Sequence, residues 1–175
     1  VEIRITDQAT GEVLPDGNTG VIEQKGDNVF LGYWEMPKKT LDAFTPDNFF
    51  ITGDLARRDK NGYITLVGRD SDMIISGGLN IYPKEIENLI DEIDEVLESA
   101  VIGVPHPDFG EGVVAVVVLK EKLVYPKNIK NTLQPRLAKF KQPKLITFVE
   151  NLPRNAMGKV QKVALREQYR ELFKK

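Results

Sequence analysis

The run Val113–Leu119, VVAVVVL, is the longest apolar stretch of the chain and the part of the sequence that decides its fold. It is far too short to cross a lipid bilayer as a helix, which takes about 20 apolar residues. A continuous run of mostly β-branched side chains predicts a strand that is buried on both faces. Just before it, Ser99–Val104 predicts another strand.

Helices are predicted around these strands. Pro83 suits the first position of a helix, and apolar residues then recur on one helical face, at Ile86, Leu89, Ile90, Ile93 and Leu97. A second helix is expected from Pro126, broken or kinked at Pro135, with apolar residues inward at Ile129, Leu133, Leu137 and Phe140. The sequence also predicts a strand at Leu145–Val149 and a last helix at Lys162–Phe173, with apolar positions at Val163, Leu165, Tyr169 and Leu172.

Residues before this part of the chain are typical of strands and turns. Val1–Ile5 alternates with period two, and Arg57–Val67 predicts a hairpin around the turn Asp59–Gly62. A short helix is expected near Lys38–Phe44. We therefore predict an α+β protein with a mostly β segment, 1–69, followed by a small α+β sandwich, 70–175, built from a roughly three-stranded sheet, a β-hairpin and helices.

Composition fits a globular protein outside oxidising compartments. The chain has 175 residues, 41% of them hydrophobic and 29% charged, which is enough to bury a core. It has no cysteine, which excludes disulfides, thiolate metal sites and a cysteine nucleophile. No signal peptide, membrane span or metal-ligand cluster is recognisable. We expect a cytoplasmic protein, or alternatively one of the mitochondrial matrix.

Charge is unevenly distributed along the chain. Residues 139–175 hold ten Lys or Arg against three Glu, whereas residues 84–98 hold seven acids against one Lys. A basic block attracts anions such as nucleotides, CoA or nucleic acid, and a solvated helix face is an equally open interpretation. A non-enzymatic module that binds nucleic acid is disfavoured, because few aromatic residues lie among the basic ones.

Three short motifs carry the chemistry. They are Thr52-Gly53-Asp54, the segment 68–87 (GRDSDMIISGGLNIYPKEIE) and the loop 153–159 (PRNAMGK). Taken singly, each has an ordinary structural interpretation: a turn carboxylate, the end of a hairpin at Gly77-Gly78, and a solvent-exposed lysine at Lys159. Arg69 alone would pair with a neighbouring carboxylate at Asp70 or Asp72.

Together, at these spacings, the motifs resemble the adenylate-forming enzymes, which include acyl-CoA synthetases, adenylation domains of peptide synthetases and firefly luciferase. The resemblance covers the whole chain as the C-terminal third of such an enzyme. Four segments look closest to malonyl-CoA synthetases: YPKEIE at 82–87, VIGVPHPDFGEGV at 101–113, RLAKFKQPK at 136–144 and LPRNAMGKVQK at 152–162. The resemblance implies a small carboxylate, ATP with Mg²⁺, and CoA as substrates, with no nucleic-acid partner.

The resemblance also assigns roles to residues. Lys159 would reach the substrate carboxylate and the α-phosphate of ATP. Asp54 would accept hydrogen bonds from the ribose hydroxyls, and Arg69 would bind the ribose or phosphate. Asp70, Ser71 and Asp72 would form a hinge, although the family usually has Asp or Lys where Ser71 stands. Five residues would contact CoA, the first two by lining its channel and the others on charge alone: Gly77, Gly78, Arg136, Lys139 and Lys141.

The same resemblance predicts that residues 1–175 alone are catalytically inactive, because the ATP phosphate loop and the acyl pocket belong to a preceding N-terminal domain. Two other ligase interpretations stay open. One is an adenylation domain that loads a carrier protein, and the other is a medium-chain or coumarate-type acyl-CoA ligase.

Overall fold

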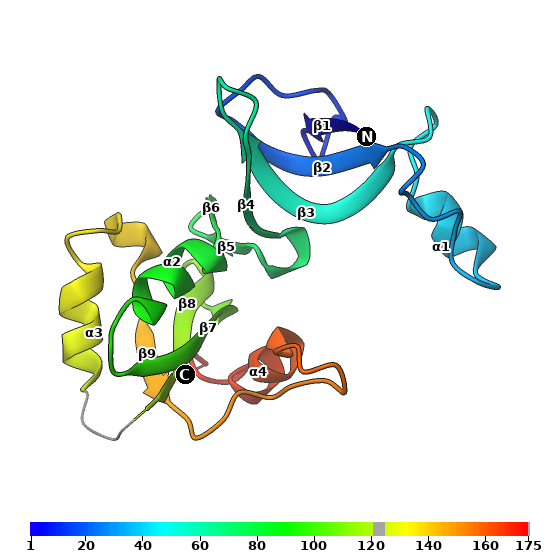
Figure 1. The fold of residues 1–175 in the computed structure, drawn as a ribbon. Coiled ribbons are helices and arrows are strands. Elements are labelled where there is room, and N and C mark those ends of the chain that lie inside the picture. The colour runs from blue at the N-terminus through cyan, green and yellow to red at the C-terminus, as the bar shows by residue number, and fades with distance from the viewer. Residues whose placement is uncertain (121–124, 175) are drawn as a thin grey trace. The chain divides into compact units, whose positions relative to one another are not determined.

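The computed structural model describes residues 1–120 and 125–174. These residues form two compact units, Val1–Ser71 and Asp72–Lys175, here called unit 1 and unit 2. Figure 1 traces the chain through both units. Unit 1 is mostly strands, whereas unit 2 combines strands with helices. The α+β class predicted from the sequence is confirmed.

Unit 1 is built on a four-stranded antiparallel sheet in the order β1-β2-β3-β4, with the strands at Glu2–Thr6, Thr19–Lys25, Phe50–Arg58 and Ile64–Arg69. The predicted hairpin at its end is confirmed: Asp59 Oδ1 accepts backbone hydrogen bonds from Asn61 and Tyr63 at 2.8 and 2.9 Å. Helix α1, Pro37–Asp42, has no buried residue.

Unit 2 contains one five-stranded sheet in place of the predicted three strands with a separate hairpin. Its strands are β5 to β9, at Ile74–Ser76, Leu79–Ile81, Val96–His106, Gly110–Leu119 and Leu145–Phe148. The order is β6-β5-β8-β7, and β9 pairs in parallel with β8. The difference arises because the hairpin β5–β6 joins the sheet where Ser76 pairs with Gly110.

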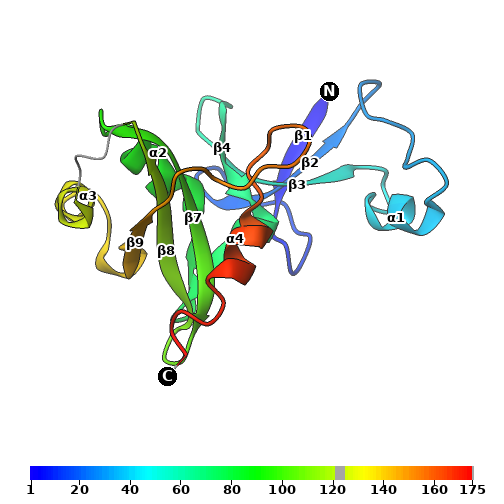
Figure 2. The same cartoon turned by 90° about the horizontal axis from the view of Figure 1, so that it is seen from below.

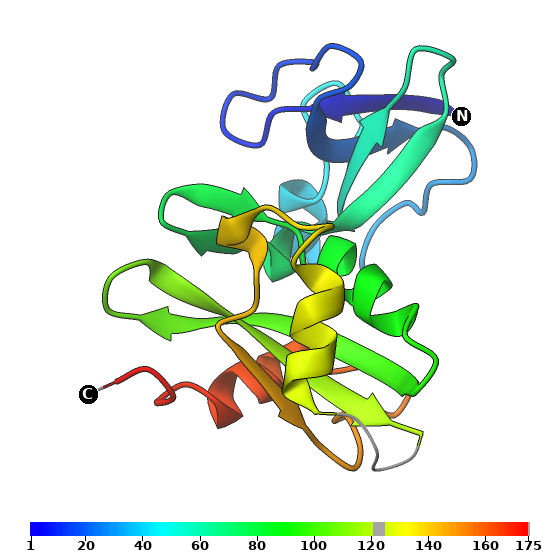
Figure 3. The same ribbon diagram turned by 90° about the vertical axis from the view of Figure 1, so that its left-hand side faces the viewer.

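Strand β8 is buried on both faces, as predicted. Val113, Ala115 and Val117 pack into one core with side chains of α2 (Pro83–Asp91) and α3 (Pro126–Leu133). Val114, Val116 and Val118 pack into a second core with Leu165 of α4, Lys162–Gln168. Figures 2 and 3 show α3 and α4 on opposite sides of the sheet.

Several helix predictions extend too far along the chain. Helix α3 ends at Leu133, so Pro135 lies beyond it, and Phe140 is exposed in a short 3-10 turn at Lys139–Lys141. Leu97 is exposed because β7 has already begun at Val96. Helix α4 ends at Gln168, with Val163 exposed. Within the described residues no helix is both long and apolar enough to cross a membrane.

Packing of α2 against β8 generates a test of the core. Ile86 of α2 is fully buried, so Ile86→Ala is expected to lower the free energy of unfolding of unit 2 by about 2–5 kcal/mol. Val163→Ala, at a side chain that is 75% exposed, is the control, with an expected change within about 0.5 kcal/mol. The measurement is a urea titration read by amide exchange in β8, since the two units need not unfold together. Equal losses would contradict this core assignment.

Candidate functional site

Lys159 lies in a closed loop between β9 and α4. Three backbone hydrogen bonds close it: Asn155 N donates to Lys159 O at 2.9 Å, Gly158 N to Asn155 O at 2.9 Å, and Gln161 N to Pro153 O at 2.8 Å. Gly158 has φ +78°, a left-handed conformation that glycine adopts without strain. The loop is therefore a defined turn with Lys159 directly after its glycine.

Asn155 holds the turn from inside. Its side-chain Oδ1 accepts the backbone N–H groups of Met157 at 3.0 Å and Lys159 at 2.9 Å. An asparagine side chain that bonds to backbone two and four residues later replaces hydrogen bonds the loop cannot make with a sheet. The backbone position of Lys159 is thus set by Asn155.

The side chain of Lys159 is exposed, and no residue that the structure describes pairs with it. Its basic neighbours differ in this respect. Arg154 forms an ion pair with Glu98 of β7, and Lys162 Nζ lies 2.6 Å from Glu87 Oε1 of α2. Lys159 is therefore the loop cation that is left available to an anionic ligand.

Asp54 and Arg69, which the sequence assigns to nucleotide binding, lie side by side in unit 1. They are paired residues of β3 and β4, and Arg69 Nε is 2.8 Å from Asp54 Oδ1. Thr52 Oγ1 accepts the backbone N–H of Asp54 at 3.0 Å, and Gly53 has φ +71°. Arg69 thus pairs with Asp54, and the expected pairing with Asp70 or Asp72 is not observed. A partly exposed carboxylate beside a guanidinium suits hydroxyl and phosphate groups respectively.

The predicted hinge coincides with the point where the two units divide. Asp70–Asp72 forms a short 3-10 turn, and the division falls between Ser71 and Asp72. Asp70 accepts a hydrogen bond from Gln8 Nε2 at 2.6 Å. The hinge role of Asp70, Ser71 and Asp72 stays a prediction.

Gly77 and Gly78 close the hairpin β5–β6, in which Ser76 pairs with Leu79. Both have positive φ, +59° and +77°, as the two central residues of a type I′ turn require. The hairpin interpretation is confirmed. The turn exposes its backbone, because a Cβ at Gly78 would meet no atom within 4 Å. Contact of this backbone with CoA stays a prediction.

The basic residues proposed for CoA phosphates are largely engaged with acids of α2 and its C-cap. Arg136 Nη1 lies 2.5 Å from Glu92, a hydrogen bond that raises the pKa of Arg136 and lowers the pKa of Glu92. Lys141 Nζ lies 2.7 Å from Glu85 Oε2. Lys139 is exposed in the 3-10 turn. A phosphate would have to displace Glu92 or Glu85, so the phosphate role of these three cations stays a prediction.

No structural role is assigned to Glu87 from the sequence. Glu87 is only 5% exposed, on the same buried side of α2 as Pro83 and Ile90. The spacing of Pro83, Glu87 and Ile90 by four and then three residues was the available signal, since such residues share a helix face.

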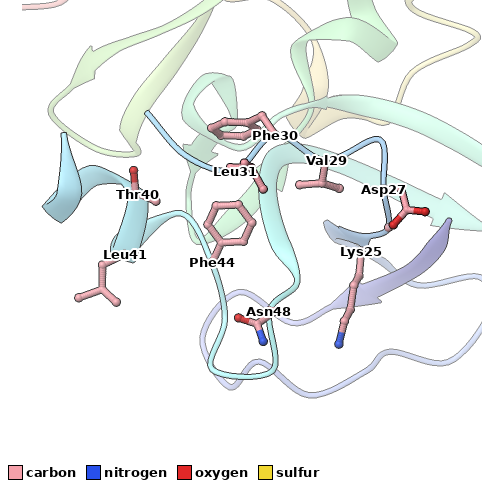
Figure 4. Close-up of a pocket in the computed structure, with 10 residues that line it drawn as sticks. Lys25, Asp27, Val29, Phe30, Leu31, Thr40, Leu41, Phe44 and Asn48 are labelled. Atoms are coloured by element: carbon pink, nitrogen blue, oxygen red, sulfur yellow. The ribbon is translucent and has the colours of Figure 1, made fainter. Parts of the chain in front are cut away.

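Unit 1 also contains a hollow of about 540 Å³ between the end of β2 and α1. Figure 4 shows Phe30 and Phe44 at its centre, with Lys25 and Asp27 at one end and Leu41 at the other. Nearby apolar side chains are strongly exposed, Leu31 fully and Trp34 by 87%. The predicted ligands Asp54 and Arg69 are not among its lining residues.

Metal ligands are not clustered in the described part of the chain. Residues 1–120 and 125–174 contain no group of three or more His, Asp or Glu side chains that is arranged to hold a metal ion.

Comparison with known proteins identifies relatives of the chain. Residues 85–159 match the AMP-binding enzyme C-terminal domain. The chain is 42% identical over 157 residues to the long-chain-fatty-acid–CoA ligase FadD13 of Mycobacterium tuberculosis, covering 90% of this chain and 31% of the ligase. It is 39% identical over 167 residues to the mitochondrial medium-chain acyl-CoA ligase ACSF2 of Danio rerio, covering 95% and 28%. The chain thus spans about a third of these relatives.

Solved structures of two enzymes have the same fold as this chain. The crystal structure of ATP-bound MatB from Rhodopseudomonas palustris superposes with a TM-score of 0.92 at 55% identity, covering 99% of this chain and 35% of MatB. The amide bond synthetase McbA from Marinactinospora thermotolerans superposes with a TM-score of 0.89 at 31% identity, covering 96% and 34%.

The role of Asn155 is open to measurement. Asn155→Ala removes the acceptor of two backbone N–H groups, and we expect amide exchange at Met157 and Lys159 to rise about five- to tenfold, as for a lost hydrogen bond of about 1 kcal/mol. Residue-resolved amide exchange by NMR measures this, with the amide of Val116 in β8 as the internal control. Unchanged protection at both loop amides would show that the loop holds its shape without Asn155.

Proposed function

The chain carries the C-terminal domain of the AMP-binding enzymes, and on that premise we propose that its parent protein is an ATP-dependent acid–thiol ligase that makes an acyl-CoA. One observation carries this proposal. Lys159, at the family's motif position, is exposed and has no ionic partner within residues 1–120 and 125–174, on a turn whose other cations are paired. A fixed turn with one available ammonium suits transient charge stabilisation.

In the first step, a carboxylate oxygen of the acid attacks the α-phosphorus of ATP. The bond from that phosphorus to the pyrophosphate oxygen breaks, which gives acyl-AMP and pyrophosphate. Two anions approach each other and negative charge develops on the phosphoryl oxygens, so the Lys159 ammonium lowers the barrier. Asp54 accepts hydrogen bonds from the ribose hydroxyls and Arg69 donates to ribose or phosphate. Mg²⁺ enters with ATP, held mainly by its phosphates.

In the second step, the CoA thiolate attacks the acyl carbon and the bond from that carbon to AMP breaks, which gives acyl-CoA and AMP. We propose that unit 2 rotates about Asp70–Asp72 between the steps. Lys159 then leaves and the exposed backbone of Gly77 and Gly78 lines the path of CoA. Two glycines with positive φ and no side chain let a narrow thiol-bearing chain approach closely.

Malonate is the acid we propose. The support is the likeness of four segments to malonyl-CoA synthetases and the 55% identity with MatB, a malonyl-CoA synthetase, against 42% and 39% with the long-chain and medium-chain ligases. The acyl pocket is expected in the preceding part of the parent protein, which has to be tested directly. Either the cytoplasm or the mitochondrial matrix would supply ATP and CoA.

We also propose that the preceding part of the parent covers the apolar surface of unit 1 around Phe30, Leu31, Trp34 and Leu41. Exposed apolar side chains gathered within a dozen residues are typical of a protein interface. The relatives are about three times as long as this chain, and the part of the parent that corresponds to their remaining length is the proposed partner of this surface.

The substrate prediction is tested by AMP formation in the full-length parent with CoA, MgATP and one acid at a time. Malonate and methylmalonate are expected to exceed acetate, a medium-chain fatty acid and coumarate. Lys159→Ala is expected to reduce the rate with malonate by about 100-fold or more, as for loss of a transition-state charge contact. The 175-residue chain alone is expected to form no AMP.

Lys60→Ala, at an exposed turn lysine of unit 1, is the matched control and should keep the wild-type rate. Turnover restricted to a monocarboxylate would remove malonate and keep the ligase. Absence of AMP with every acid would refute the proposed function.

The apolar surface gives a separate test. In the chain alone Leu31 is fully exposed, so Leu31→Ala should change the free energy of unfolding by less than about 0.5 kcal/mol. In the full-length parent the same substitution should lower the free energy of unfolding by about 2–5 kcal/mol, because a buried leucine is truncated. Urea titrations of both proteins measure the difference, and equal effects would show that Leu31 stays uncovered.

A further inference from the structure

We infer that two ion pairs, Arg154–Glu98 and Lys162–Glu87, act as ionic anchors that fix the Lys159 loop on strand β7. The four side chains are positioning residues for Lys159. The structural part of this inference concerns unit 2 alone, and its catalytic consequence rests on the proposed function.

The first anchor precedes Lys159. The guanidinium of Arg154 binds two groups at once: Nη2 contacts the carboxylate of Glu98 in β7, and Nη1 donates to the carbonyl oxygen of Gly158 at 2.6 Å. Gly158 is the residue directly before Lys159. Arg154 therefore ties the turn of the loop, and with it the backbone of Lys159, to the edge of the sheet.

The second anchor follows Lys159. Lys162 opens α4, and its Nζ is 2.6 Å from Glu87 Oε1, with side-chain exposures of 16% and 7%. Glu87 Oε1 also accepts the backbone N–H of Val101 in β7 at 2.9 Å. Breaking such a buried pair leaves an uncompensated charge, which is strongly unfavourable. The start of α4 therefore cannot leave the sheet without leaving the Glu87 carboxylate buried and without its cation.

The two anchors converge on one strand from both sides of the loop. Glu98 lies in β7, and Glu87 is fixed to Val101 of the same strand. The loop between Arg154 and Lys162 is thereby held at both ends, while the Lys159 side chain projects from it without a partner of its own among the described residues. Such an arrangement holds the backbone still and leaves the ammonium free to contact a ligand.

Lys162 also reaches the start of unit 2. Its Nζ lies 4.0 Å from Asp72 Oδ2, and Asp72 is the first residue of that unit. The second anchor thus places the base of the Lys159 loop beside the segment at which the chain passes from one unit to the other.

The anchors are tested first in the 175-residue chain, by amide exchange. Glu87→Gln keeps the shape of the side chain and an acceptor for Val101, and removes only the charge. We expect amides at 155–161 to exchange about tenfold faster or more, with the β8 amides little changed. Glu171→Gln, which neutralises the exposed pair with Lys174, is the matched control and should leave the loop unaffected.

Two results would overturn the anchors. One is unchanged loop exchange in Glu87→Gln, and the other is an equal rise throughout unit 2, which would indicate a general role in stability. If a single variant fails to fold, the double variant Glu87→Gln/Lys162→Met removes both charges together and should restore folding while leaving the loop amides fast. Slow loop amides in the folded double variant would also overturn the inference.

The catalytic consequence is tested in the full-length parent by separating the two half-reactions. Glu87→Gln should lower kcat for acyl-adenylate formation about tenfold or more with little change in KM for ATP. Thioester formation from added acyl-adenylate and CoA should keep its rate, because Lys159 has left by then. Equal losses in both half-reactions, or none in either, would refute the positioning role. A wild-type parent that forms no adenylate would refute the proposed function instead, and the exchange result would still decide the anchors.

Discussion

A strand with apolar side chains on both faces has to be covered on both faces, and β8 imposes this constraint on unit 2. Successive residues from Val113 to Val118 enter opposite cores, so α2 and α3 cover one face and α4 the other. The loop that carries Lys159 leads directly into α4, whose Leu165 is buried in the second core. The place of the candidate catalytic lysine therefore follows from the need to cover a sheet, before any ligand is considered.

Ion pairs connect the same elements of unit 2. Acids at 85–98 pair with basic residues at 136–162 four times, as Glu85–Lys141, Glu87–Lys162, Glu92–Arg136 and Glu98–Arg154. Four of the seven acids in the acidic block are thus paired with cations that follow them in the chain. The exposed pairs contribute little stability each, whereas the buried pair Glu87–Lys162 is costly to break. Among the cations of the Lys159 loop and the start of α4, Arg154 and Lys162 belong to that set and Lys159 does not.

Local patterns predicted the strands of unit 2, the hairpin turn at Gly77 and Gly78, and the family to which the domain belongs. They failed where tertiary contacts decide. The helical spacing of apolar residues extends to Leu97, although β7 has already begun there. In the next helix the same spacing extends to Phe140, which lies in a 3-10 turn. Glu87 carries a charge, and composition alone places charges outside. Its burial is compensated by Lys162, 75 positions later, and by the backbone N–H of Val101 in β7.

The parallel pairing of β9 with β8 bears on how the domain forms. The hairpin β7–β8 brings neighbouring segments together and closes a short loop, whereas β9 reaches β8 only after a crossover that includes α3. Closing a longer loop has a higher entropic cost and slows folding. Assembly is thus expected to begin with the local hairpin and to add β9 and the segment behind it late. The lysine at the centre of the proposed chemistry would then be among the last parts of the nascent domain to reach its place.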